Sequence, residues 1–158
     1  GCSSGAVGTP FCFGDGSGTP CPCSNTGPSG QGCANSTGNG GLLTGTGTDS
    51  VAVGNLVLNA ANLLPNQPIL FFQGNNAVNS GNGNVFGAGL RCAGGGVIRL
   101  EIIFANASGE ASTTGNIPAA AGISAGDLKR YQGWYRNPGG PCSASFNLTQ
   151  GLEVSWGA

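Results

Sequence analysis

The cysteines of this 158-residue chain are crowded at one end, and this crowding divides the chain in two. Five of the seven cysteines lie within the first thirty-three residues: Cys2, Cys12, Cys21, Cys23 and Cys33. Gly, Ser and Pro fill most of the sequence between them. Such a stretch buries too little apolar surface to order itself, so disulfides, a metal ion or a neighbouring chain must hold it. We therefore divide the chain into an N-terminal arm, residues 1–40, and a folded domain, residues 41–158.

The composition predicts one globular domain that is rich in turns. Apolar residues make up 39% of the chain, which argues against complete disorder, and the 32 glycines show no triplet period, which argues against collagen. The five basic and six acidic residues leave a net charge of −1, too little for a surface that binds phosphates or an anionic membrane. The longest apolar runs are too short to span a bilayer. We expect no nucleic-acid partner and no membrane insertion.

From Gly41 onward, β-branched and aromatic residues come in short runs separated by Gly, Asn and Pro, which is typical of strands and turns. We expect nine strands: Leu42–Thr46, Ser50–Val53, Asn55–Ala61, Gln67–Gln73, Gly89–Ala93, Val97–Asn106, Glu110–Thr114, Leu128–Arg136 and Phe146–Trp156. The helix-like stretch Ala119–Gly126 is rich in glycine and small residues, and suits a loop or one short turn better.

Alternation of apolar and polar residues in these runs predicts half-buried antiparallel strands. We expect the apolar run Val97–Phe104 to be a central strand. Phe71 and Phe72 are adjacent and must face opposite sides, so at least one of them lies outside this core or is covered by something else. The predicted fold class is all-β: an antiparallel two-sheet sandwich, immunoglobulin-like or jelly-roll, with an extended, disulfide-rich N-terminal arm.

Seven cysteines in a chain without histidine indicate an oxidising compartment rather than a cytosolic zinc or redox protein. We expect six of them in disulfides: Cys12, Cys21, Cys23, Cys33, Cys92 and Cys142. The single residue between Cys21 and Cys23 is too short a gap for structural zinc. The expected pairs, among 15 possible pairings, are Cys92–Cys142, Cys12–Cys23 and Cys21–Cys33. Cys2 is then free or bonded to another chain.

The chain opens at Gly1 without a basic and apolar leader, which fits a mature form without its signal peptide, although a fragment would look the same. Together with the cysteine content, this predicts a secreted protein, located outside the cell or at its surface.

Five stretches read together resemble the glycine-rich module at the C-termini of secreted planctomycete-type bacterial proteins. The stretches are Phe11–Cys23, Leu70–Ala77, Gly87–Gly95, Tyr131–Asn137 and Phe146–Leu152. The resemblance covers Phe11 to Ala158 and implies no catalytic activity. The layout of an arm and a sandwich is also similar to subunits of extracellular helical fibrils that are linked by donated N-terminal segments.

Catalytic side chains are scarce. The chain has no histidine, six carboxylates and one lysine, so it lacks the usual general base and its orienting partner. Glycoside cleavage would need a pair among Glu101, Glu110 and Glu153 at a fixed separation. Glu101 and Glu153 take polar positions of alternating strands, which indicates solvated side chains. We expect no enzymatic activity.

Two further kinds of site are suggested by short motifs. Asp15, in Gly14–Gly18, resembles the start of a shortened calcium loop, but a turn closed by its own side chain explains the same residues. Asp15 is thus the one calcium candidate, and we expect no other metal or cofactor. Three Asn-x-Ser/Thr sequons occur, at Asn35, Asn106 and Asn147, and Asn35 is the first choice for a glycan.

These observations favour a structural subunit that polymerises with copies of itself. The arm of one copy would add to a groove or sheet edge of the next, with Val7, Phe11 and Phe13 as apolar anchors. Head-to-tail donation does not close, so it predicts a filament. The alternative is a carbohydrate-binding or cell-surface adhesion module whose binding face is Trp134, Tyr135 and the loop Asn75–Asn84. A secretion or sorting tag is the third hypothesis.

Overall fold

The structure, a computed structural model, describes residues 6–158, and nearly all of its regular secondary structure is antiparallel β-sheet. The strands are β1 Thr9–Phe11, β2 Leu42–Thr46, β3 Val57–Ala61, β4 Pro68–Gly74, β5 Asn76–Ala77, β6 Asn84–Phe86, β7 Gly89–Arg91, β8 Ala93–Gly94, β9 Ile98–Phe104, β10 Ala111–Ser112, β11 Leu128–Arg136, β12 Phe146–Leu148 and β13 Gly151–Ser155. One short helix, α1, spans Ile117–Ala121, and 3₁₀ turns occupy Val78–Gly81 and Pro141–Ser143. No helix in the described residues is long and apolar enough to cross a membrane.

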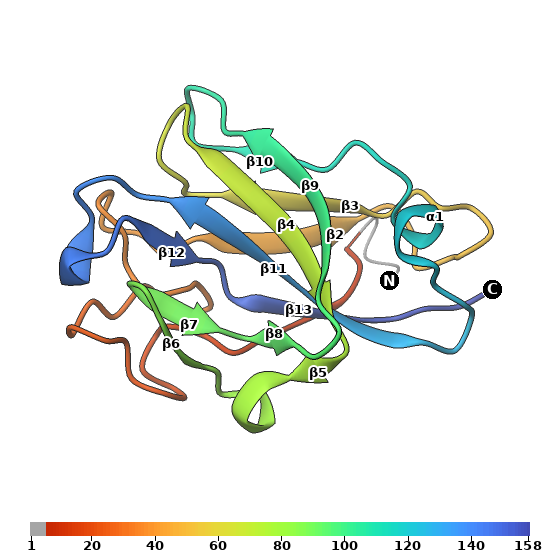
Figure 1. Cartoon of the computed structure of the whole chain (residues 1–158), viewed down its shortest axis with the longest axis horizontal. Helices are drawn as coiled ribbons and strands as arrows, with labels where there is room; N and C mark the ends of the chain where they lie inside the picture. The colour runs from red at the N-terminus through yellow and green to blue at the C-terminus, as the bar shows by residue number, and fades with distance from the viewer. Residues whose placement is uncertain (1–5) are drawn as a thin grey trace.

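Two sheets face each other across the main core (Figure 1). The larger sheet has the order β1-β13-β11-β4-β9, and β12 pairs with the far half of β11. The smaller sheet has the order β10-β3-β2. The short pairs β5-β8 and β6-β7 complete the β structure. The all-β, antiparallel character predicted from the sequence is confirmed, whereas the immunoglobulin-like or jelly-roll type stays a prediction.

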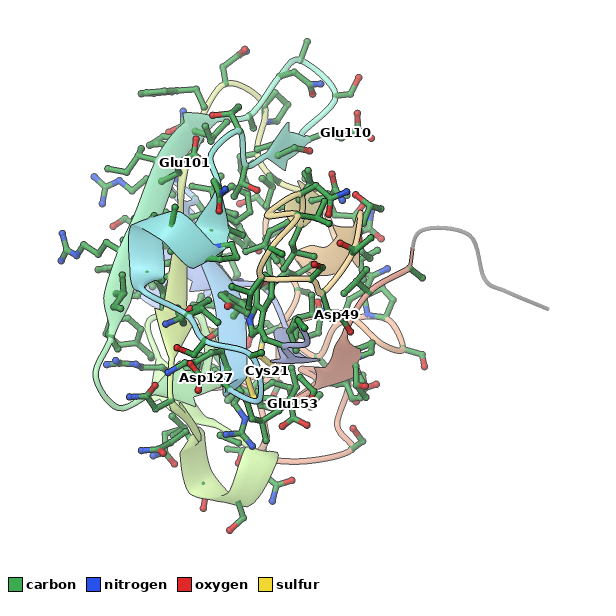
Figure 2. The ribbon with its side chains drawn as sticks, turned by 90° about the vertical axis from the view of Figure 1, so that its right-hand side faces the viewer. Cys21, Asp49, Glu101, Glu110, Asp127 and Glu153 are labelled. Carbon is green, nitrogen blue, oxygen red and sulfur yellow. A yellow bond between two sulfur atoms is a disulfide. The ribbon has the colours of Figure 1, made fainter. Side chains whose placement is uncertain are left out.

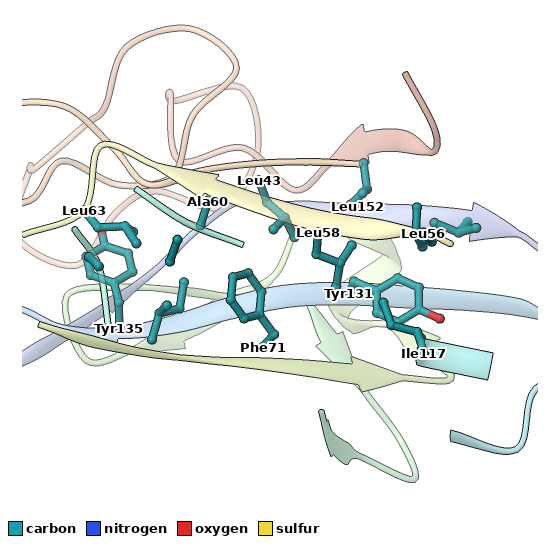
Figure 3. Packing of buried hydrophobic residues seen from close by; sticks show 14 of the residues in the cluster. Leu43, Leu56, Leu58, Ala60, Leu63, Phe71, Ile117, Tyr131, Tyr135 and Leu152 are labelled. Atoms are coloured by element: carbon teal, nitrogen blue, oxygen red, sulfur yellow. The ribbon is translucent and has the colours of Figure 1, made fainter. Parts of the chain in front are cut away.

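The core lies between the facing sheets because each sheet presents its apolar alternate positions inward. Leu43 and Leu58 from the smaller sheet meet Phe71, Tyr131 and Tyr135 from the larger one (Figure 3). Each of these five side chains is no more than 1% exposed. Phe72, next to Phe71, lies on the opposite face of β4, where residues of β6, β8 and β12 cover it. The prediction that the two phenylalanines separate is therefore confirmed.

Several strand predictions need correction. The bounds of β2 and β11 agree with the predicted ones, but Ser50–Val53 forms a turn, and the predicted strand Phe146–Trp156 is divided into β12 and β13. The division falls at Thr149 and Gln150, whose buried side chains bond to backbone groups. α1 begins at Ile117 because Asn116 caps it, accepting from the Ala119 N–H at 3.0 Å.

The prediction that Val97–Phe104 is a central strand is wrong, because β9 is an edge strand of the larger sheet. A register shift in its pairing with β4 breaks the simple alternation. Leu100 and Ile103 both pack against the core, while Ile102 and Phe104 are 64% and 67% exposed on the outer face. An apolar run therefore does not by itself distinguish a buried strand from an edge strand with an exposed apolar face.

Candidate functional site

The segment before Cys12 is held by backbone pairing along one edge of the larger sheet. β1 pairs with β13 in the register Thr9↔Glu153, Pro10↔Leu152 and Phe11↔Gly151. Val7 donates its N–H to the Gly45 carbonyl at 2.9 Å. Gly8 between these contacts has φ of +89°, and a Cβ there would come within 2.9 Å of the Leu152 side chain. Glycine thus allows the segment to lie close against β13.

The three predicted assembly anchors have different surroundings within their own chain. Val7 is half-buried and packs against the main core. Phe11 is half-buried against a small cluster of cystines and Leu90, and a Cβ at Gly151 would meet its ring at 2.6 Å. Phe13 is half-buried and belongs to no hydrophobic cluster. Val7 and Phe11 therefore fill apolar sites on the sheet, and Phe13 does not.

Three disulfides connect the N-terminal region, which we define as residues 6–40, to itself and to the sheets. They are Cys12–Cys92, Cys21–Cys33 and Cys23–Cys142. Cys21–Cys33 was expected, but the other two replace the expected pairs Cys12–Cys23 and Cys92–Cys142. Cys2 lies outside the described residues.

The unexpected pairs form because the N-terminal region returns to the sheets instead of extending away from them. In Figure 1 its red and orange loops run beside β6, β7 and β12. Asn25 bonds to the Ala88 carbonyl at 2.8 Å, which brings the neighbouring Cys23 near Cys142. Cys12 directly follows β1 and lies near Cys92, which precedes β8. Residues 12–40 are consequently fastened to the chain that carries them.

Two buried glutamines that the sequence analysis did not single out join separate parts of the fold. Gln150 accepts from the Leu43 N–H at 2.9 Å and donates to the Leu43 carbonyl at 2.6 Å, so it connects β2 to the larger sheet. Gln132 accepts from the Cys92 N–H and donates to the carbonyls of Leu90 and Thr149. No described buried side-chain N or O atom lacks a partner. A polar residue at a strand position that should be apolar is the one sequence signal that could have indicated these bonds.

The carboxylates considered for catalysis lie apart, and those of Glu101 and Glu153 are engaged in bonds. Figure 2 shows Glu101, Glu110 and Glu153 at separate places on the molecule. Burial disfavours the ionised form of Glu101, but hydrogen bonds from Thr114 and Gly115 outweigh it and lower its pKa. Glu153 forms an ion pair with Arg130 at 2.9 Å. Glu110 lines a pocket beside β2, β3 and β10, and neither Glu101 nor Glu153 lines that pocket.

Asp15, the calcium candidate, has both carboxylate oxygens engaged by donors of the N-terminal region, one of them within its own turn. One oxygen accepts from the N–H and hydroxyl of Ser17, at 3.0 and 2.5 Å, and the other accepts from the Gly30 N–H at 3.0 Å. These bonds, first that from Gly30, lower the pKa of Asp15. The described residues contain no group of three or more His, Cys, Asp or Glu side chains that could hold a metal ion. The arrangement is that of a turn closed by an aspartate.

The carbohydrate-binding face predicted from the sequence is not assembled. Tyr135 is 1% exposed in the main core, where burial raises its pKa to about 12. Trp134 is its neighbour on β11 and therefore points to the opposite side of the sheet, next to Phe86 and Phe146. Only Trp134 of the pair is available at the surface.

The three sequons differ sharply in exposure. Asn35 is 5% exposed, and its amide donates to the Asn62 carbonyl at 2.8 Å and to the Tyr135 hydroxyl at 2.9 Å. Asn147 is fully buried, and its amide donates to the carbonyls of Cys33 and Ala34. Asn106 is exposed, and only its oxygen is engaged, by the N–H groups of Ser108 and Glu110. The geometry favours Asn106 over Asn35, the first choice from the sequence.

Comparison of the chain with protein-family models, with curated proteins and with solved structures finds no match.

Proposed function

We propose that the chain is a structural subunit of a secreted extracellular filament in which the N-terminal segment of one copy pairs through β1 with β13 of the next. The mechanism is physical and needs no cofactor. Exchange between copies would replace the β1–β13 ladder and the Val7–Gly45 bond with the same contacts made between chains. Because each copy gives one segment and receives one, the assembly grows head to tail.

The observation that carries this proposal is the contrast on the two sides of Cys12. Residues 7–11 are held by backbone pairing and by the side chains of Val7 and Phe11 alone. From Cys12 onward, three disulfides fasten the N-terminal region to its own chain. The segment that can be exchanged is therefore shorter than the predicted arm. Phe13 follows Cys12, so it is not one of the anchors of this segment.

The chemical setting agrees with an extracellular role. Three disulfides indicate an oxidising environment outside the cytoplasm. We take the two facing sheets as a sandwich that serves as the rigid body of the subunit. The resemblance to planctomycete-type modules and to donor-segment fibrils stays a prediction that agrees with this function, as does the role of Cys2 in bonding another chain. The alternative adhesion module is less favoured, because Trp134 and Tyr135 lie on opposite faces.

A cross-link experiment tests the exchange directly. Thr9 and Glu153 are direct partners in the β1–β13 ladder, so a Thr9→Cys/Glu153→Cys chain in a Cys2→Ser background can form a disulfide there. If the segment is exchanged, filaments confirmed by electron microscopy will give a ladder of covalent multimers on a non-reducing denaturing gel. Filaments that give only cross-linked monomer would show that β1 pairs with β13 of its own chain. An absence of filaments would contradict the proposal outright.

The matched control places the same cross-link inside one chain. Thr44 and Asn59 are direct partners within one chain, on β2 and β3, and neither takes part in the β1–β13 ladder. Thr44→Cys/Asn59→Cys must give monomer bands from the same filaments. Deleting residues 1–11, which leaves Cys12 and all three disulfides in place, should give a folded chain that no longer polymerises.

A further inference from the structure

The outer surface of β11, β4 and β9 is an exposed, mainly apolar patch flanked by arginines, which we call the outer patch. The strand register aligns Trp134 with Leu70 and Ile102 in one cross-strand row. Two residues further along the strands lies the row of Arg136, Pro68 and Phe104. On the other side of the central row, Arg99 is the partner of Phe72. The outer patch comprises Pro68, Leu70, Arg99, Ile102, Phe104, Trp134 and Arg136.

Two shallow pockets meet at Trp134 in this patch. One has a volume of about 200 Å³ and is lined by Arg91, Arg99 and Phe86 besides Trp134 and Leu70. The other has a volume of about 240 Å³ and adds Arg136 and Ile102 to the same two shared residues. Leu70 and Trp134 line both, so the two pockets adjoin at these side chains, and we call the two together the depression.

Trp134 is held rigidly at the centre of this depression. Its ring centroid lies 5.5 Å from that of Phe86 and 5.6 Å from that of Phe146, and the rings of Phe86 and Phe146 are 4.9 Å apart. Tilted and edge-on contacts of this kind are the favourable geometries for aromatic pairs. The indole is thus fixed before any ligand arrives, and this reduces the entropy that binding would cost.

The cations of the chain are concentrated on this depression. Of five basic residues, Arg91, Arg99 and Arg136 line it. Within residues 6–158 the one ion pair is Arg130 with Glu153, so these three arginines have no carboxylate partner. None of the residues described as lining either pocket is acidic. Unpaired guanidinium groups beside an aromatic surface form a site for a ring that carries an anionic group.

From this arrangement we infer that the outer patch binds an acidic oligosaccharide, a chain of sugar rings that carry carboxylate or sulfate groups. The apolar face of one ring stacks on Trp134, and its acidic groups accept from Arg99 and Arg91 on one side and from Arg136 on the other. Arg91 has its Nε bonded to the Ala93 carbonyl at 3.3 Å, which leaves its terminal nitrogens for such a ligand.

The spacing of the arginines selects an oligosaccharide over a single sugar. Arg99 and Arg136 stand at diagonally opposite corners of the patch, two strands and four residues apart in register. Ordinary sheet spacings put their Cα atoms roughly 16 Å apart. One sugar ring does not span that distance, whereas consecutive rings do. A nucleic acid is disfavoured, because the net charge of −1 provides no extended phosphate-binding surface.

The test uses the two tryptophans as internal probes in an NMR titration of the folded chain. Trp134 lies in the patch, while Trp156 is 2% exposed and donates its indole N–H to Tyr131 at 3.0 Å. An oligogalacturonate or a heparin oligosaccharide should shift the Trp134 indole resonance saturably and leave that of Trp156 in place. Comparing the two oligosaccharides distinguishes a carboxylated ligand from a sulfated one. A neutral cello-oligosaccharide of the same length should bind much more weakly.

Charge-removing variants locate the site. Arg99→Gln and Arg136→Gln alter exposed side chains and should each weaken binding about tenfold, the effect of losing one charge-assisted hydrogen bond. Lys129→Gln removes the same charge from a residue that lines neither pocket and should leave binding unchanged. Equal weakening by Lys129→Gln, equal binding of the neutral sugar, or no shift at Trp134 would overturn the assignment. A Trp134 resonance that depends on protein concentration alone would assign the patch to a second copy and also overturn it.

Discussion

The sheets and the N-terminal region are ordered by different means. Every buried member of the main core lies between Leu43 and Trp156, and the two sheets hold each other by apolar contact. The second cluster consists mainly of disulfide-bonded cysteines. Its buried members are Cys12, Cys21, Cys33, Leu90 and Cys92, and Phe11 packs against them. A segment that is poor in branched apolar residues can thus be as well packed as a sheet when covalent bonds replace the missing core.

Glycine makes the close packing of the N-terminal region possible. A Cβ at Gly14 would collide with the backbone of Cys33, and a Cβ at Gly40 would collide with that of Gly32. Backbone bonds such as Gly14 N–H to the Gln31 carbonyl, at 2.9 Å, fill the space that side chains occupy elsewhere. The region is therefore stabilised by backbone contact and cystines, and contributes little apolar surface to the main core.

Reduction of all three disulfides should separate the behaviour of the two regions most strongly. Each one contributes about 3 to 5 kcal/mol by constraining the unfolded chain, and two of them close loops of 80 and 119 residues. We expect reductant to remove amide-exchange protection from Gly14, Gly27 and Ala34 first, while β4 and β11 keep theirs because their core is apolar. Hydrogen exchange followed by mass spectrometry measures this difference.

Loss of protection in both regions at the same reductant concentration would contradict this expectation. In that case the cystines would support the sheets as much as the N-terminal region, and the chain would be one cooperative unit. A chain with Cys21→Ala/Cys33→Ala alone provides the internal control. Its lost loop spans 12 residues, so its cost should be the smallest of the three, about 3 kcal/mol.

The next largest effect concerns the bond between the two sheets. Gln150→Leu removes both hydrogen bonds to Leu43 and leaves a buried N–H and a buried carbonyl without partners. We expect the free energy of unfolding to fall by about 3 kcal/mol, as measured by urea denaturation. Gln67→Leu is the matched control, because this half-buried glutamine makes no side-chain hydrogen bond in the described chain, and it should change stability by less than about 1 kcal/mol. Equal losses in both variants would show that apolar packing alone joins the sheets.

Sequence periodicity predicted the sheets well where one face is buried and the other is exposed. Strands β2 and β11 have the predicted bounds because their alternation follows from facing the core. The predicted position or length of a strand was wrong where a contact between residues distant in sequence determines it. The edge position of β9 depends on which strand joins β4, and the break between β12 and β13 depends on Gln150 reaching Leu43.

The candidate sites were less predictable, because they depend on which loops meet in space. Pairing Cys12 with Cys92 requires the N-terminal region to return along β13, and no local pattern encodes that return. The sequon at Asn35 was the first choice for a glycan, yet its amide lies against Tyr135. Trp134 and Tyr135 could have been separated from the sequence, since adjacent strand residues face opposite sides.

Tyr135 allows the junction of the two regions to be probed by pH. Burial raises its pKa to about 12, and its hydroxyl accepts from Asn35 of the N-terminal region. A raised pKa means that the folded state favours the protonated phenol. The resulting stability is complete below pH 10, the ordinary value, and is lost as the pH rises toward 12. The loss should be on the order of 2 to 3 kcal/mol.

The pH effect is measured by urea denaturation between pH 9 and about 12, with phenolate absorbance recorded in parallel. Burial also raises the pKa of Tyr131, so neither tyrosine should titrate before the chain unfolds. Tyr135→Phe should flatten part of the pH dependence. Phenolate absorbance that appears near pH 10 with the fold intact would show that the junction is open to solvent, contrary to the burial of Tyr135.

The smallest expected effect distinguishes exposed from buried asparagines. In a host that modifies Asn-x-Ser/Thr sequons, we expect glycan on Asn106 and none on folded Asn35 or Asn147, because only Asn106 has a free, exposed amide nitrogen. Ser108→Ala removes the sequon without touching the side-chain bonds of Asn106, so it should abolish the glycan and change stability by less than about 0.5 kcal/mol. Peptide mapping with and without deglycosylation decides the matter. Glycan on Asn35 in correctly folded material would mean that the contact between the N-terminal region and Tyr135 can open. Residues 12–40 would then not be fastened to their own chain in the way that the assembly mechanism requires.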